Sequence, residues 1–443
     1  MSAFRPVALL AIALVAWAAP APASAATKIE RVVSPGGIEA WYVREPTVPI
    51  LTLDFIFRDA GSATDPAGRE GLAEFQMGLL DDGAGELDAL AFKRRAEELA
   101  IEMSFGAGRD RASGSLRTLS ERREEAFRLL GLALARPRFD AAPLEESRAR
   151  ILAAIRRQDE DVRGTAGRTF FAKAFEGHPY ARPGRGTLDS VGAIARADIE
   201  RRHRDRLARD RLIVGAVGDV EPAELGRLLD VAFGGLPAKA APAPAVAETR
   251  PGAQGVHVVR KAVPQAWAVF GLPGIKRDDP DYYAAYLMNY TLGGGGFVSR
   301  LYREVREERG LAYSVASYLA LTDRAGLIMG SVGTANARFG ESLALIRAAI
   351  VRMRDEGPSE QELADAKTYV TGSFPLGLDT NAKIASVLVG IQADNLGIDF
   401  LERRNALFER VSRADVMRAA KRLLDPDKLL VVVVGDPPEL PGG

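Results

Sequence analysis

Two stretches of the chain, "ARADIERRHRDRLARDRLIVGAVGD" (Ala195–Asp219) and "SRADVMRAAKRLLDPDKLLVVVVGD" (Ser412–Asp436), follow one pattern and decide the fold. Aligned without a gap, they share Arg-Ala-Asp near the start and Val-Gly-Asp at the end. In each, a capped helix is predicted to lead into a strand, because an uninterrupted run of Val, Ile and Leu indicates a strand buried on both faces. The 443-residue chain therefore contains a duplicated domain.

The order of predicted elements is the same in both copies. Each copy opens with strands, such as "ILTLDFIFRDAGS" (50–62) and "QAWAVFGLPG" (265–274), and continues with a helical stretch, further strands and a helical block. Apolar residues alternate along 51–57, which indicates a strand with one face in a core. Strands paired with helical blocks favour an α+β fold. We expect two homologous α/β sandwich domains, each a mainly antiparallel sheet covered by helices.

A segment rich in Ala and Pro separates the two copies. The stretch "GGLPAKAAPAPAVAETRPGAQG" (234–255) has few large apolar residues, which is typical of a stiff linker. We therefore predict a first domain over residues 26–236, a linker over 237–254 and a second domain over 255–443.

The N-terminus has the features of a secretory signal peptide. One basic residue, Arg5, precedes an apolar run, and the small residues Ala23-Ser24-Ala25 follow it. The run is about a dozen residues long, short of the roughly 20 that cross a bilayer. We expect residues 1–25 to be removed, leaving a periplasmic protein without a membrane span. The chain has no cysteine and so forms no disulfide.

The bulk charge excludes one class of partner. Lys and Arg together number 59, as do Asp and Glu, so no net field attracts nucleic acid. The chain also lacks a G-x-S-x-G nucleophile elbow and a G-x-x-x-x-G-K-[ST] phosphate loop.

The stretch "GLAEFQMG" (71–78) is the place to look for a metal. A helical H-x-x-E-H motif puts two imidazoles on one face to bind zinc, and its glutamate acts as general base. Here the matching residues are Glu74, Met77 and Gly78. A carboxylate at Glu74 could supply one ligand, but a thioether is a weak ligand and glycine supplies none.

The three histidines do not replace the missing ligands. They are His178, His203 and His257, and no two are three or four positions apart. His178 lies in a loop rich in Pro and Gly, where we expect it to order the loop by a hydrogen bond. For His203 and His257 we expect surface or packing roles.

The stretch "LGGGGFVSRLYREVREERGLAYSVASY" (292–318) is the most informative part of the second copy. Phe297, Leu301 and Val305 recur every four residues, which predicts one apolar face of a helix ending near Gly310.

Arg306 and Tyr313 lie on either side of the predicted helix-to-strand bend, which could bring both into one cleft. A guanidinium and a neutral phenol are suited to hold a peptide carbonyl and to stabilise an oxyanion. On chemistry alone the alternative stays open that Arg306 belongs to a solvated charge run and Tyr313 to a core.

Three stretches together resemble the pitrilysin or insulinase-type peptidases, in particular the short subunits that include mitochondrial processing peptidase. They are "DAGSATDPAGREGLAEFQMGLL" (59–80), "GHPYARPGRGTLDSVGAIARADIERRHRDRLARDRLIVGAVGDV" (177–220) and "LGGGGFVSRLYREVREERGLAYSV" (292–315). The active branch also needs a distal glutamate on a later helix. The helix predicted over 147–161 offers Ala153 and Ala154 near that place.

The resemblance implies a function through a partner. Zinc-less subunits of this family keep an Arg and a Tyr in the second domain and form a clam-like chamber with a zinc-bearing subunit. Arg306 and Tyr313 match those positions, so we expect them to contribute in trans to a shared cleft around an extended peptide. We expect no cofactor in this chain and zinc in a similar-length H-x-x-E-H partner. The alternative is a stand-alone peptide-binding or assembly protein.

Overall fold

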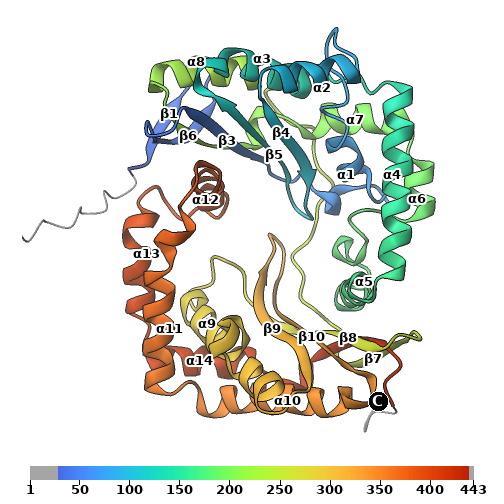
Figure 1. The fold of residues 1–443 in the computed structure, drawn as a ribbon, viewed down its shortest axis with the longest axis vertical. Coiled ribbons are helices and arrows are strands. Elements are labelled where there is room, and N and C mark those ends of the chain that lie inside the picture. The colour runs from blue at the N-terminus through green and yellow to red at the C-terminus, as the bar shows by residue number, and fades with distance from the viewer. Residues whose placement is uncertain (1–27, 439–443) are drawn as a thin grey trace, which may run out of the picture.

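A computed structural model describes residues 28–438, so the predicted signal peptide lies outside the described residues (Figure 1). We call residues 28–236 the first half and residues 255–438 the second half. Each half is built on one sheet. The first sheet contains β1 (Glu30–Val33), β2 (Glu39–Arg44), β3 (Ile50–Phe57), β4 (Glu102–Ala107), β5 (Ala112–Leu119) and β6 (Leu212–Gly218). The second contains β7 (Gly255–Arg260), β8 (Gln265–Pro273), β9 (Ala312–Leu321), β10 (Gly326–Ala335) and β11 (Leu430–Gly435).

The two sheets have the same topology. The first has the order β1-β2-β6-β3-β5-β4 and the second β7-β11-β8-β10-β9, so they correspond once β1 is set aside. β2 pairs parallel to β6, as β7 does to β11, and every other pairing is antiparallel. The predicted fold class, two duplicated and mainly antiparallel α/β sandwiches, is confirmed.

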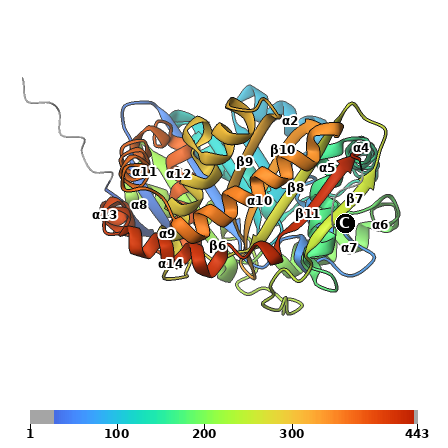
Figure 2. The same cartoon turned by 90° about the horizontal axis from the view of Figure 1, so that it is seen from below.

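Helices from the same half cover the outer face of each sheet (Figures 1 and 2). On the first sheet these are α2 (Ala89–Glu98), α3 (Arg123–Ala135) and α8 (Pro222–Phe233). On the second they are α9 (Tyr282–Asn289), α10 (Phe339–Glu356) and α14 (Arg413–Leu423). The alternating residues Leu51, Leu53, Phe55 and Phe57 all point into the outer core of the first half, as their spacing predicts.

The inner face of each sheet is covered by a helix from the other half (Figure 1). Helix α5 (Val162–Ala174) packs on β8 and β11 of the second sheet, and α12 (Asn381–Ala393) packs on β3 and β6 of the first. The buried Phe170 of α5 shares a core with Val432, and the buried Leu388 of α12 shares one with Val217. This exchange explains why β6 and β11 are apolar on both faces.

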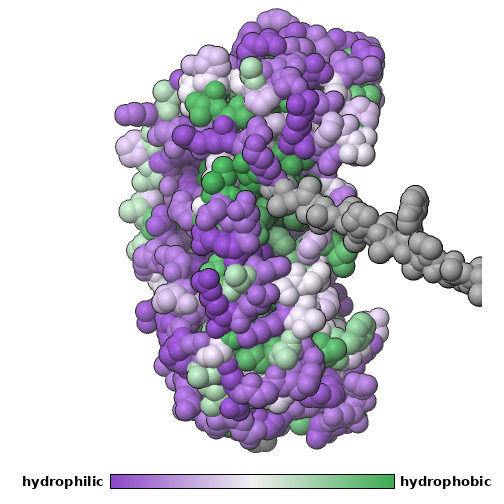
Figure 3. All heavy atoms as spheres, turned by 90° about the vertical axis from the view of Figure 1, so that its left-hand side faces the viewer, coloured by the Kyte–Doolittle hydropathy of each residue, from purple (hydrophilic) through white to green (hydrophobic). Residues whose placement is uncertain are grey.

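The remaining helices form two walls between the halves, with α4 (Ala141–Glu160) and α6 (Leu188–Ala193) in one and α11 (Glu360–Gly372) and α13 (Phe400–Glu409) in the other (Figure 1). Two more helices, α1 (Leu72–Met77) and α7 (Arg196–Arg206), pack together in the first half. The segment 237–254 contains no helix or strand. Figure 3 shows a largely hydrophilic face in which the surface is hollowed between the halves on one side. None of the helices in residues 28–438 is long and apolar enough to cross a membrane.

One predicted packing contact is wrong. Leu301 and Val305 are buried as expected, but Phe297 is 75% exposed. It lies in a separate 3-10 turn over Gly296–Val298, because Gly296 has a φ of 59° and interrupts the helical path before the next helical segment begins. The Phe297 ring instead packs edge-on against Tyr302, with 4.9 Å between ring centres.

Candidate functional site

The predicted metal positions lie on helix α1, whose six residues are too few to fix its own position. A buried carboxylate does this instead: Asp65 accepts hydrogen bonds from the backbone N–H groups of Gly71 and Ala73, each at 3.1 Å. Arg202, on the neighbouring helix α7, pairs with Asp65 at 2.9 Å. Burial raises the pKa of Asp65 to about 6, although Arg202 opposes the shift.

Each residue at a position of the zinc motif has a structural role and does not act as a metal ligand. The Glu74 carboxylate forms an ion pair with Arg185 at 2.9 Å. The Met77 side chain is fully buried in the core, and Gly78 ends the helix with an N–H that donates to the Glu74 carbonyl at 2.9 Å. Ala153 and Ala154 lie on α4 and carry no ligand atom. Within residues 28–438, no three His, Cys, Asp or Glu side chains cluster in a way that could hold a metal ion.

The histidines occupy the kinds of place predicted for them. His178 accepts a hydrogen bond from the backbone N–H of Tyr180 at 3.1 Å and so orders its loop. His203 packs in the first half, with its Nδ1 atom 3.4 Å from the Gln76 side-chain nitrogen. Burial lowers the pKa of His203 to about 4. His257 lies on strand β7.

A small pocket of about 250 Å³ lies beside Glu74. Three guanidinium groups line it, from Arg109, Arg168 and Arg185, against the single carboxylate of Glu74. Arg168 also pairs with Asp159, at 2.6 Å, outside the pocket lining. The pocket is therefore positively charged where a metallopeptidase of this fold would hold a metal cation. Sequence reasoning missed these arginines; the only signal was the Arg-rich "GRDR" of the β4–β5 turn and "PGRG" of the loop at 183–186.

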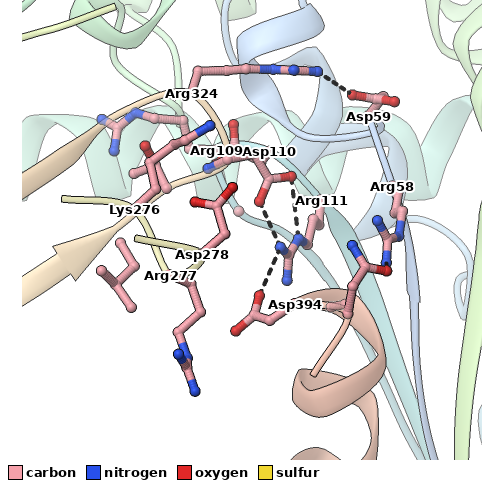
Figure 4. A pocket seen from close by; sticks show the side chains of 16 residues that line it. Arg58, Asp59, Arg109, Asp110, Arg111, Lys276, Arg277, Asp278, Arg324 and Asp394 are labelled. Atoms are coloured by element: carbon pink, nitrogen blue, oxygen red, sulfur yellow. Dashed lines mark hydrogen bonds and ion pairs between the residues drawn. The ribbon is translucent and has the colours of Figure 1, made fainter. Parts of the chain in front are cut away.

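A larger cavity of about 680 Å³ lies where the two halves meet (Figure 4). Its lining comes from both halves, and ion pairs join them across it. Arg111 of the first half pairs with Asp323 at 2.6 Å and with Asp394 at 3.4 Å. Arg324 of the second half pairs with Asp59 at 3.2 Å (Figure 4). The cavity is thus strongly polar, and the two hairpin turns β4–β5 and β9–β10 meet at its wall.

The structure brings Arg306 and Tyr313 together. Arg306 lies in a short helical segment over Tyr302–Glu307 with π-type hydrogen bonding, and Tyr313 lies at the start of β9. The guanidinium carbon is 4.9 Å from the centre of the Tyr302 ring and 5.2 Å from that of Tyr313. Tyr313 is 74% exposed, so it is not a core residue. Neither Arg306 nor Tyr313 lines the pocket beside Glu74.

Two strand edges are available beside these groups. β4 pairs only with β5, and β9 pairs only with β10, among the described residues. The unpaired backbone groups of such edges can accept an added strand. Ala107, the last residue of β4, lines the pocket beside Glu74, and Tyr313 is the second residue of β9. An extended peptide along either edge therefore passes one of the two groups of side chains.

Comparisons with known proteins agree with this architecture. Residues 193–370 match the family described as "Peptidase M16 inactive domain". The crystal structure of a peptidase M16 inactive domain from Pseudomonas fluorescens is 29% identical, with a TM-score of 0.87, over 93% of this chain and 98% of that one. Over residues 193–370 the chain matches the M16, or pitrilysin, family. The predicted resemblance is thereby confirmed.

Two curated relatives show the range of M16 proteins to which the chain is similar. A protein of Helicobacter pylori named "Non-peptidase homolog YmxG" is 29% identical over 340 residues, which are 76% of this chain and 78% of that protein. The mitochondrial-processing peptidase subunit beta of Blastocladiella emersonii is 22% identical over 92% of this chain and 88% of that protein. This chain carries Glu74, Met77 and Gly78 at the positions where an H-x-x-E-H motif would supply its zinc ligands and general base.

Proposed function

We propose that this protein is the non-catalytic subunit of a periplasmic zinc metallopeptidase and binds an extended peptide. In this proposal a similar-length partner with an intact H-x-x-E-H motif supplies the zinc and the general base. Arg306 and Tyr313 hold the scissile carbonyl and stabilise the oxyanion that develops on it. The observation that carries the proposal is the placement of this pair: an always-charged guanidinium and an exposed phenol lie side by side next to a free strand edge.

The family relationship supports a partnership. One relative is, by its name, a subunit of a processing peptidase. The side chains of this chain's α1 supply no zinc site, since Met77 is in the core and Gly78 has no side chain. Catalysis in a shared cleft then needs a metal from elsewhere, and the groups that this chain retains are those that stabilise charge without a metal.

The experiment is co-expression with a secreted M16 chain of similar length that carries H-x-x-E-H, followed by an assay of the purified complex on an unstructured peptide. Removing one oxyanion donor typically lowers turnover by about 10²–10³-fold. We expect that loss for Arg306→Ala and for Tyr313→Phe, with the unfolding temperature unchanged.

Two neighbouring variants serve as controls. Arg303→Ala removes an exposed arginine of the same helical segment, and Tyr318→Phe removes a hydroxyl from the same strand. Both are expected to retain turnover. Unchanged turnover in Arg306→Ala and Tyr313→Phe would reject the assigned roles, and stoichiometric zinc with hydrolysis by the isolated chain would reject the non-catalytic assignment.

A second candidate is a stand-alone peptide-binding or assembly protein. The relative named as a non-peptidase homologue favours it. The two candidates differ in one accessible observation. The first requires a secreted chain with intact H-x-x-E-H in the same organism that co-purifies with this protein, whereas the second predicts peptide binding with no such chain and no hydrolysis.

A further inference from the structure

Arg109 is a charged side chain without a charged partner. It lies two residues beyond the end of β4, and its guanidinium makes no hydrogen bond or ion pair to any other residue within 28–438. The guanidinium carbon instead lies 3.9 Å from the centre of the Phe171 ring, on helix α5. Burial lowers the pKa of Arg109, which reflects the cost of holding the charge away from water. An unpaired, partly buried cation is costly, so a role for it is expected.

The turn that carries Arg109 is held in place by its own backbone. The N–H groups of Ser62 and Ala63 donate to the carbonyls of Gly108 and Arg109, at 2.9 and 2.8 Å. A Cβ atom at Gly61 would lie 2.3 Å from the Arg109 carbonyl oxygen, so only glycine fits there. The guanidinium is therefore presented from a fixed position, which lowers the entropic cost of binding a ligand.

The surroundings of Arg109 favour an anion. Arg109 lines the larger cavity between the halves (Figure 4), and it also lines the pocket beside Glu74. In that pocket Arg185 is neutralised by Glu74, and Arg168 is neutralised by Asp159. One positive charge remains, on Arg109. A guanidinium presents two parallel N–H donors whose geometry matches a carboxylate.

We propose that the Arg109 pocket binds a carboxylate of the peptide, either an acidic side chain or the C-terminal carboxylate. The inference rests on the proposed peptide binding and specifies its substrate class. A peptide added to the edge of β4 reaches the pocket at Ala107, where the next groups beyond the strand are Arg109 and Arg185. The pocket thus gives the first half a preference for acidic peptides.

The test measures binding of short labelled peptides to the full mature chain by fluorescence anisotropy. The probe is an unstructured peptide of about ten residues, long enough to cover an edge strand, that contains glutamates. Its matched partner has glutamine at those positions, and each is prepared with a free and with an amidated C-terminus. We expect the glutamate peptide, or the free-acid form, to bind about 10- to 100-fold more tightly than its neutral counterpart.

Arg109→Gln is expected to remove this preference while leaving the affinity for the neutral, amidated peptide unchanged. The control is Arg94→Gln, an exposed arginine of α2 whose ion pair is a weak one at 3.8 Å, and it should keep the preference. The unfolding temperature of both variants reports on folding.

The outcomes separate the two proposals. Equal affinity for acidic and neutral peptides, or a preference that survives in Arg109→Gln, overturns the carboxylate pocket and leaves peptide binding intact. No binding of any peptide overturns the proposed peptide binding together with this inference. Loss of preference between glutamate and glutamine peptides identifies a side-chain carboxylate, whereas loss between acid and amide forms identifies the C-terminus.

Discussion

In each half an Asp–Arg ion pair joins two equivalent helices, but the two ion pairs differ in their exposure to water. In the first half, Asp65 pairs with Arg202 between α1 and α7, and their side chains are only 1% and 4% exposed. In the second, Asp281 precedes α9 and pairs with Arg418 and Arg422 of α14, whose side chains are 57% and 47% exposed. Asp281 is buried as Asp65 is, so the two copies differ in their arginine partners, which are buried in the first half and about half exposed in the second.

The buried copy does more than join two helices. Besides pairing with Asp65, Arg202 donates to the backbone carbonyls of Ala60 and Gly61, at 2.8 and 3.0 Å. These residues begin the loop that fixes the Arg109 turn. The difference between the halves teaches that the first half uses a desolvated ion pair to position the loop that holds the Arg109 turn, whereas in the second half the arginines of the pair stay open to water.

The largest expected effect breaks this buried pair. Asp65→Asn leaves the Arg202 guanidinium buried without a counter-charge, and such a loss typically costs about 3–5 kcal/mol of stability. The measurement is the free energy of unfolding in denaturant at about pH 8, where Asp65 is ionised because its pKa is about 6.

The matched variant in the second half is Asp281→Asn. Its partners are roughly half exposed, so water can solvate them, and we expect a loss of about 1 kcal/mol. Equal losses in the two variants would contradict the distinction between a buried and a solvated pair.

The exchanged helices give a second way to test the comparison. Leu388 of α12 is fully buried against the first sheet, although it belongs to the second half in sequence. Leu388→Ala should lower the free energy of unfolding by about 3 kcal/mol, the middle of the range for a buried leucine. Hydrogen exchange of β3 and β6 should rise with it. Lys383→Ala on the exposed side of the same helix is the control. If Leu388→Ala instead raised hydrogen exchange only in the second sheet, the packing of α12 on the first sheet would be contradicted.

Local patterns predicted the sheets and the duplication, because strand periodicity and the repeated helix-strand unit can be recognised within short, contiguous segments of the sequence. They did not predict the exchange of α5 and α12. An amphipathic or apolar helix shows that it has a core face, but not which of two similar sheets it covers. The exposure of Phe297 was missed for a related reason: its spacing fitted a helix, and only the backbone of Gly296 shows where the helical path breaks.

The candidate site also has one part that the sequence predicts and one part that it does not. Arg306 and Tyr313 could be proposed from sequence because both lie beside one helix-to-strand bend. The Arg109 pocket could not, since its lining comes from α1, the β4–β5 turn, α4, α5 and the loop before α6, which meet only in the folded chain. Charge counting also fails there. The overall balance of 59 Lys and Arg against 59 Asp and Glu residues conceals the Arg109 guanidinium, which has no charged partner among residues 28–438.

A further expected effect concerns pH and again distinguishes the halves. In the repeated segments His203 lies opposite Ala420, so only the first half has a titrating group at this place between its helices. Burial lowers the pKa of His203 from 6.5 to about 4. Between these values the unfolded chain binds a proton that the folded chain does not. The stabilising contribution is therefore full above pH 6.5 and is lost as the pH falls toward 4.

We expect this loss to be about 2 kcal/mol, less than the full shift implies because the imidazole is partly exposed. Asp65, with its raised pKa of about 6, titrates in the same pH range and changes the stability in the opposite direction, so the decisive measurement compares two proteins and not one curve.

His203→Gln keeps a side chain of similar size that does not titrate. Its free energy of unfolding should fall less than that of the natural chain between pH 6.5 and about 4. Thr380→Ala, which alters a helix cap in the second half, should lower stability by a similar amount at both pH values, since the lost hydrogen bond from the Lys383 backbone N–H involves no group that titrates in this range. Parallel curves for His203→Gln and the natural chain would show that the imidazole keeps contact with solvent and that the two halves do not differ in their response to pH.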